Sequence, residues 1–178
     1  TAVAGAIREK LPDAELFAVK VFDRRLSVHT DVIFRALDWC IRNRMDAINL
    51  SLGTPKAEYK EAFEGVLRRT SEIGILVVSA GEMLPGSLDG AIGAWPDFEC
   101  SRDEYRVVDG RYYASGYPRP LPGLPMNANL QGVSFAVANL TGLLLRERLA
   151  LEGGAPVDDG QRDARLRDCG GIDGEDVV

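Results

Sequence analysis

The sequence has a single histidine, His29, among its 178 residues. Any chemistry that needs a histidine from within this chain therefore depends on that one residue. His29 lies in a polar stretch between a β-rich segment and a helical segment, which is typical of a solvent-exposed turn. Three neighbouring aspartates, Asp23, Asp31 and Asp38, are expected to serve as loop, cap and helix-surface residues. We therefore assign no catalytic triad from within the chain.

Cysteine is scarce as well. The three cysteines, Cys40, Cys100 and Cys169, leave at least one thiol unpaired, and none has the spacing of a metal ligand. A disulfide scaffold is therefore not expected, and the cellular compartment stays open. Cys40 falls on the apolar side of an expected helix, where we expect it to be part of the core.

The chain also lacks an excess of positive charge, a long apolar run and a phosphate-binding loop. Its formal net charge of −6 argues against nucleic acid or an anionic membrane as a partner. No apolar run approaches the length of a transmembrane helix. A nucleotide-binding α/β domain would need a glycine-rich loop after its first strand, and the segment Phe22-Asp23-Arg24-Arg25 is not such a loop.

Short apolar segments alternate with segments of helical periodicity. The expected strands are Leu16–Phe22, Ala47–Leu52 and Ile75–Ser79, and the expected helices begin at Thr30 or Asp31 and run from about Lys56 to Glu72. This order predicts an α/β fold with a mainly parallel sheet flanked by helices on both faces. Sites in such sheets lie at the carboxyl ends of the strands, where Ser51-Leu52-Gly53 and Ala80-Gly81-Glu82 fall.

The second half of the chain is less regular. Asp109-Gly110 lies between apolar residues and predicts a two-residue hairpin turn. The segment from Tyr117 to Pro125 is rich in proline and is expected to form an extended loop. A long apolar helix follows Gly132 and ends near Leu149, and we expect one domain over residues 1–151. Residues 152–178 are rich in glycine and acidic residues, which is typical of a disordered or lightly docked tail.

A serine directly after a glycine turn opens this last helix, in the segment Gly132-Val133-Ser134-Phe135-Ala136. Such a serine can cap the helix, or it can react where the free N–H groups stabilise a developing oxyanion. The segment resembles the nucleophile region of the subtilisin-like serine proteases (subtilases), G-T-S-x-A-x-P. Val133 and Ala138 depart from that pattern at its threonine and its proline.

Further segments resemble the same family in the same order. Thr1 to Ile7 is similar to the continuation of the H-G-T-x-V-A-G motif, and Leu16 to Phe22 to the A-V-K-V strand. Met45 to Gly53 resembles the D-V-I-N strand with its S-L-G edge, and Gly74 to Glu82 the strand that ends in A-A-G-N. Ala91 to Trp95 looks like another strand of the family.

The resemblance implies a serine endopeptidase that cleaves peptide or protein substrates through an acyl-enzyme on Ser134. It implies that the catalytic histidine and aspartate lie upstream of Thr1, so that this chain alone is an incomplete and inactive catalytic domain. The alternative is a catalytically inactive subtilase-like protein with a peptide-binding or regulatory function. No metal or other cofactor is expected from the residues themselves, whereas calcium is possible from the family resemblance alone.

The resemblance also assigns two substrate-binding segments. Ser51, Leu52 and Gly53 would pair with an extended substrate as an added β-strand, and Ser79, Ala80 and Gly81 would form a wall of the primary specificity pocket. Glu82 occupies the position of the asparagine that donates a hydrogen bond to the oxyanion. A carboxylate cannot donate this bond, so only a protonated carboxyl group, favoured by burial, could replace the amide.

Overall fold

The structure, a computed structural model, describes residues 2–22 and 28–152. Along the chain the elements are α1 (Ala2–Lys10), α2 (Thr30–Arg42), β1 (Ala47–Leu50), the 3-10 helix η1 (Ala57–Tyr59), α3 (Lys60–Glu72), β2 (Leu76–Ala80), β3 (Ile92–Asp97), β4 (Tyr105–Val108), β5 (Arg111–Ser115), the 3-10 helix η2 (Met126–Ala128) and α4 (Val133–Glu152).

The strands form one sheet in the order β1-β2-β3-β5-β4. The first four strands in this order are parallel to their neighbours, and β4 pairs with β5 in the antiparallel direction. The β4–β5 turn is Asp109-Gly110, and both residues have positive φ angles, 49° and 75°. Positive φ at both central residues is the mark of the tight hairpin turn that the sequence predicts.

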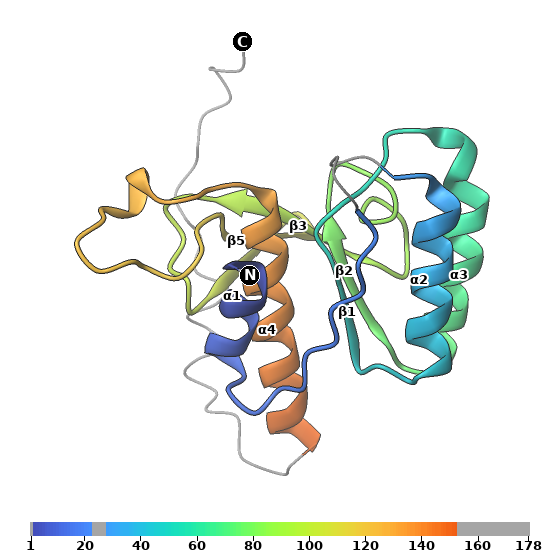
Figure 1. Cartoon of the computed structure of the whole chain (residues 1–178), viewed down its shortest axis with the longest axis horizontal. Helices are drawn as coiled ribbons and strands as arrows, with labels where there is room; N and C mark the ends of the chain where they lie inside the picture. The colour runs from blue at the N-terminus through green and yellow to red at the C-terminus, as the bar shows by residue number, and fades with distance from the viewer. Residues whose placement is uncertain (1, 23–27, 153–178) are drawn as a thin grey trace.

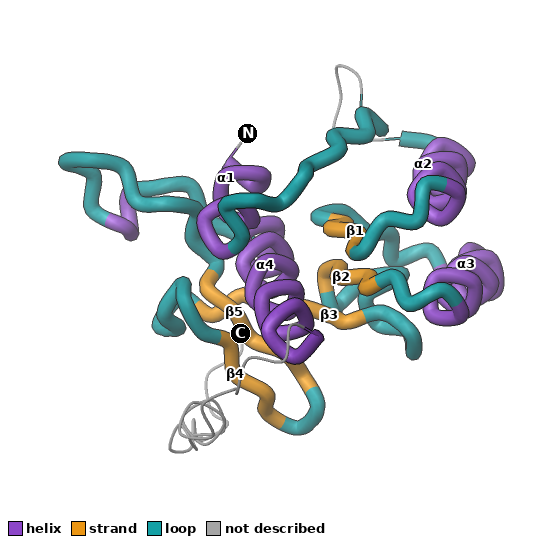
Figure 2. The backbone as a smooth tube through the Cα atoms, turned by 90° about the horizontal axis from the view of Figure 1, so that it is seen from below, coloured by secondary structure: helices purple, strands orange, loops and turns teal. Residues whose placement is uncertain are grey.

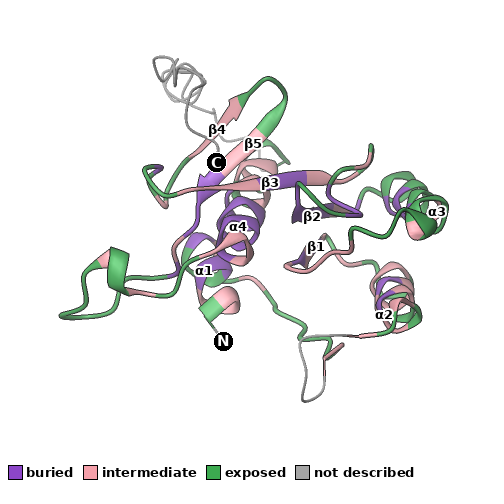
Figure 3. Ribbon diagram, turned by 90° about the horizontal axis from the view of Figure 1, so that it is seen from above, coloured by how far each residue is buried: buried purple, intermediate pink, exposed green. Residues whose placement is uncertain are grey.

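Helices cover both faces of the sheet. Helices α2 and α3 pack on one side of β1 and β2, and α4 packs on the other side with α1 beside it (Figures 1 and 2). The first half of α4, from Phe135 to Leu143, is buried against the sheet (Figure 3). The prediction of a mainly parallel α/β sheet with helices on both faces is thus confirmed.

Most of the expected elements are present with shifted ends. The strand expected over Ala47–Leu52 ends at Leu50, and α4 continues to Glu152 rather than ending near Leu149. The residue that precedes α2 as its cap is His29, which makes no side-chain capping bond, in place of the expected Thr30 or Asp31. Helix α1 is not among the elements that the sequence predicts.

The strand expected over Leu16–Phe22 is wrong. This segment is an irregular coil between α1 and α2 (Figure 1), and Phe17 in it is 51% exposed. A strand needs a neighbour to share its backbone hydrogen bonds. Strand β1 is the edge of the sheet on this side, and within the described residues it pairs with β2 alone.

Candidate active site

Ser134 lies in the first turn of α4, at the carboxyl end of the sheet. The turn before it contains Gly132, whose φ of 146° is a conformation that side-chain-bearing residues rarely adopt. The Gly132 N–H donates to the Gly116 carbonyl at 2.9 Å, and the Phe135 N–H donates to the Gly132 carbonyl at 3.0 Å. Ser134 is half-buried. The interpretation of Ser134 as a cap is wrong, because the helix already begins at Val133.

The first turn of a helix leaves its N–H groups without partners inside the helix, and the helix dipole makes this end favourable for negative charge. A group bonded to the Ser134 side chain would lie beside these donors. The geometry therefore suits a reaction in which negative charge develops on a group bonded to the Ser134 side chain.

The segment after β1 lies directly against Ser134. The Ser51 hydroxyl donates to the Ser134 carbonyl at 3.1 Å, and the Asn49 side-chain amide donates to the Ser51 hydroxyl at 2.9 Å. Residues 83 positions apart are thus joined at the carboxyl end of the sheet, as the parallel topology predicts.

The two expected substrate-binding segments also lie side by side. Ser79 is fully buried, and its hydroxyl donates to the Leu52 carbonyl at 3.1 Å. Gly81 is fixed by its N–H, which donates to the Ala94 carbonyl at 3.0 Å. A Cβ atom at Gly81 would lie 2.4 Å from the ring of Trp95, so no larger residue fits here without displacement.

The loop that follows Gly81 is joined to the segment that follows β1. Thr54 and Leu84 exchange two backbone hydrogen bonds of 3.1 and 3.0 Å, which bring Met83 against Gly53. A small cavity of about 180 Å³ opens beside this bridge. Its lining consists of Thr54, Pro55, Ala57, Lys60, Glu82, Met83, Leu84 and Ser87. The sequence pattern missed Met83 and Leu84, because no motif marks the loop that carries them.

Glu82 is exposed to solvent. The expected burial of its carboxyl group is therefore wrong. An exposed carboxylate offers only acceptor oxygens, so it supplies no N–H or O–H donor to an oxyanion.

His29 is exposed, as expected for a turn residue, and the described residues show no hydrogen bond between it and Ser134. Asp31 pairs with Arg35 at 3.0 Å and Asp38 with Arg69 at 2.7 Å, both on helix surfaces. Asp23, like Arg24, Arg25 and Cys169, lies outside the described residues.

Of the two described cysteines, Cys100 is buried and Cys40 is half-buried against the core of α2 and α3. Burial raises the pKa of the Cys40 thiol, which makes it less reactive. Over residues 2–22 and 28–152, no cluster of three or more potential metal ligands occurs. No helix in the same ranges is long and apolar enough to cross a membrane.

Comparison with known proteins gives the family. A family model described as "Subtilase family" matches residues 1–97, which is more than half of the chain and includes Ser51 to Gly53 and Ser79 to Glu82. Ser134 lies beyond the matched residues, so its role depends on the geometry and on the motif around it.

The curated relatives include subtilisins and alkaline proteases. Subtilisin E of Bacillus subtilis (strain 168) is 39% identical over 69 residues, which cover 39% of this chain and 18% of the relative. The alkaline protease of Alkalihalobacillus alcalophilus is 30% identical over 141 residues, 74% of this chain and 35% of the relative. The chain thus spans well under half the length of these curated relatives.

Solved structures share the fold. The prenylagaramide maturation protease PagA superposes with a TM-score of 0.55 at 23% identity, over 76% of this chain and 56% of that one. The S41 psychrophilic protease gives the same TM-score at 20% identity, over 81% and 57%. The parallel sheet, the serine at the start of α4 and these matches agree, and the chain belongs to the subtilase family.

Proposed function

We propose that this chain forms part of a serine endopeptidase, and that Ser134 attacks the peptide bond of a peptide or protein substrate. The observation that carries the proposal is the position of Ser134 in the first turn of α4, held against the end of β1 by Ser51. The free N–H groups of that turn suit the tetrahedral intermediate, and the Ser134 N–H is one proposed donor.

The general base of this reaction is a histidine oriented by an aspartate, as in other triads. The exposed position of His29 at the start of α2 supports the proposal that both residues come from outside this chain. The proposed cycle is attack by the Ser134 hydroxyl, transfer of its proton to the histidine, release of the amine and hydrolysis of the ester by water.

The substrate is proposed to bind across the ends of β1 and β2. Ser51, Leu52 and Gly53 would present backbone groups to an extended peptide. Ser79, Ala80 and Gly81 would line the space beside its reacting residue, with Met83 at the end of that space. The contact of Met83 with Gly53 supports this last assignment. Calcium binding is proposed from the family resemblance alone.

The test uses the natural gene product that contains this sequence, treated with a fluorophosphonate probe. We expect one labelled peptide, containing Ser134, and no label in the Ser134→Ala variant, whose circular dichroism spectrum should be unchanged. Label that persists in the alanine variant would exclude Ser134 as the nucleophile.

A second candidate is a subtilase-like protein that binds peptides without cleaving them. Glu82 favours this candidate, because it stands in the motif position of the asparagine that donates to the oxyanion and has no amide group to donate. Saturable peptide binding by a gene product that neither reacts with the probe nor cleaves peptides would select this function over the first.

A further inference from the structure

A chain of hydrogen bonds runs from the middle of α4 to its first turn by way of β1. The buried Thr141 hydroxyl lies 3.2 Å from the Asn49 side-chain oxygen, and it also donates to the Val137 carbonyl at 2.7 Å. The Asn49 amide donates to Ser51, and the Ser51 hydroxyl donates to the Ser134 carbonyl. Thr141 and Ser134 are seven residues apart, which places them on the same face of the helix.

The direction of these bonds gives each residue a definite part. A hydroxyl group has one proton, which Ser51 donates to the Ser134 carbonyl, and a second group can orient the hydroxyl by donating to its oxygen. Asn49 is that donor. The Asn49 side-chain oxygen lies 3.2 Å from the Thr141 hydroxyl, whose proton is closer to the Val137 carbonyl, and the Asn49 amide nitrogen faces Ser51.

The backbone is therefore bonded to the sheet region at Gly132 and at Ser134 itself. Before it, the Gly132 N–H is bonded to the Gly116 carbonyl just after β5, and after it the Ser134 carbonyl is bonded to Ser51 just after β1. A shift in the second anchor would rotate the first turn of α4 and move its free N–H groups relative to the Ser134 side chain.

We propose that Asn49 is a positioning residue that acts through Ser51 to hold the first turn of α4, and with it Ser134, in the orientation used for reaction. The catalytic meaning of this inference rests on the proposed function. The geometric part does not, and it can be measured in the 178-residue chain without proteolysis.

The experiment introduces a thiol as a probe of the helix terminus. In the Ser134→Cys chain, the rate of alkylation of residue 134 is followed against pH by peptide mass spectrometry, which separates it from the three natural cysteines. A thiolate at a helix N-terminus has a pKa below the ordinary value of about 8.5. We expect Asn49→Ala, and separately Ser51→Val, to raise this pKa by about 0.2–0.7 unit, as the usual size of helix-terminus effects implies.

The decisive result is the combination. If Asn49 acts through Ser51, adding Asn49→Ala to Ser51→Val produces no further shift in the pKa of the thiol. Ser51→Thr has the shape of Ser51→Val but keeps the hydroxyl, so it should leave the pKa of the thiol unchanged. It can be compared with the Ser134→Cys chain even where Ser51→Val is unstable. Thr70→Val, which removes another buried hydroxyl bond, to the Leu67 carbonyl in α3, serves as the control for general destabilisation.

Additive shifts, equal pKa values for Ser51→Val and Ser51→Thr, or a shift of the same size in Thr70→Val would each overturn the proposal. These outcomes are independent of the proposed protease activity, since no histidine takes part in the alkylation. Absence of fluorophosphonate labelling in the gene product would refute the protease and leave the thiol result standing.

Discussion

Glu82 is the residue at which this chain differs most from the chemistry of its family. The subtilase pattern has an asparagine there, and in a subtilisin the loss of that donor costs about 2.7–4 kcal/mol of transition-state stabilisation. Glu82 is exposed, and its side chain lacks the N–H donor of an asparagine. The side chain is therefore expected to limit turnover wherever the complete protein is a protease.

The corresponding prediction uses the natural gene product. Glu82→Asn should raise kcat by up to about a hundredfold, because the interaction is made in the transition state, whereas KM should change little. Glu64→Gln removes a carboxylate from the exposed side of α3 and should leave both constants unchanged. Equal kcat values for Glu82→Asn and the parent would mean that another donor occupies the site.

Gly81 shows how closely the end of β2 is packed. A Cβ atom there would overlap the Trp95 ring at 2.4 Å, whereas a Cβ atom at Gly65, within α3, would contact nothing within 4 Å. We expect Gly81→Ala to lower the free energy of unfolding by about 1–3 kcal/mol, as overpacking does. Gly65→Ala should raise it by about 0.5–1 kcal/mol, because alanine is the better helix former.

Urea denaturation of the two alanine variants and the parent chain measures both effects. An unchanged free energy of unfolding for Gly81→Ala would mean that Trp95 moves aside freely and that the end of β2 is packed less tightly than the contact indicates.

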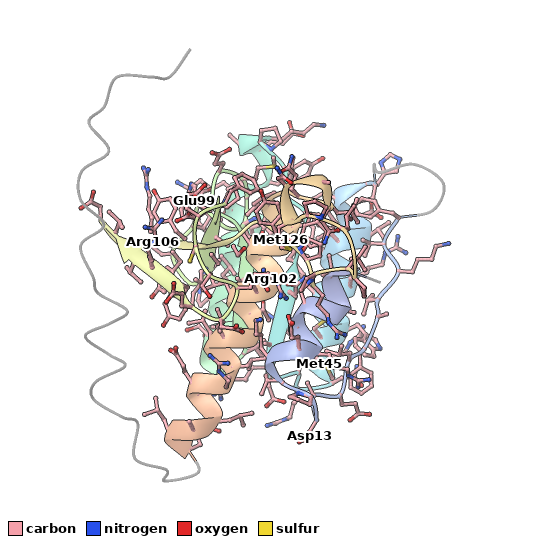
Figure 4. All side chains as sticks on the ribbon, turned by 90° about the vertical axis from the view of Figure 1, so that its left-hand side faces the viewer. Asp13, Met45, Glu99, Arg102, Arg106 and Met126 are labelled. Atoms are coloured by element: carbon pink, nitrogen blue, oxygen red, sulfur yellow. The ribbon has the colours of Figure 1, made fainter. Side chains whose placement is uncertain are left out.

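At the scale of elements, α1 is held to the rest of the fold by a buried lysine. The Lys10 side chain is 1% exposed, with its ammonium group 3.0 Å from Asp103 and 3.1 Å from Glu9. Arg102, labelled in Figure 4, also pairs with Glu9. The stem of Lys10 lies against Gly142 of α4, where a Cβ atom would be 2.9 Å from it.

This cluster predicts a pH dependence. The hydrogen bond from Lys10 lowers the pKa of Asp103. Burial alone would raise the pKa of Glu9, but its bonds to Arg102 and Lys10 have the larger effect together, so the pKa of Glu9 is also lowered. Carboxyl groups with lowered pKa values stabilise the fold above their ordinary values, near pH 4, and this contribution is lost as the pH falls through the folded-state values.

We therefore expect the parent chain to lose more stability between pH 6 and pH 3 than Lys10→Met, in which the carboxylates have lost this partner. Lys60→Met, which removes an exposed pair with Glu64, is the matched control and should follow the parent. Thermal unfolding at the two pH values measures these losses. Equal losses of stability in all three proteins would show that α1 docks without help from the ion pairs.

The elements that the sequence predicts correctly are those whose partners are close in the chain. Strands β1 and β2 are joined by α3, and apolar periodicity defines all three. Leu16–Phe22 has an equally β-rich composition, yet within the described residues it pairs with no strand. Composition gives the tendency to extend, and only the neighbouring strand decides whether a ladder forms.

The same distinction applies to the site. The parallel topology correctly predicts that the ends of β1 and β2 lie together, and the resemblance selects Ser134 beside them. The sequence shows Asn49 only as one polar residue within an apolar strand and does not indicate its contacts. Its contact with Thr141 spans 92 residues, and no local pattern encodes a pair at that distance.

At the scale of the whole molecule, the described residues bring Ser134 against the segment after β1 and place no histidine beside it. The single histidine, His29, is exposed at the start of α2, on the face of the sheet opposite α4. Removal of the histidine from a triad lowers kcat by about a millionfold, because the serine hydroxyl is a weak nucleophile when nothing accepts its proton.

The purified 178-residue chain should therefore show no Ser134-dependent cleavage of peptides and no reaction with a fluorophosphonate. The measurement compares the parent with Ser134→Ala and His29→Ala in a fluorogenic peptide assay, and all three should give the same background rate. Cleavage that disappears in both variants would identify His29 as the base, and it would require α2 to bring His29 across the sheet to Ser134. Cleavage that disappears in Ser134→Ala alone would show that a group other than histidine accepts the proton.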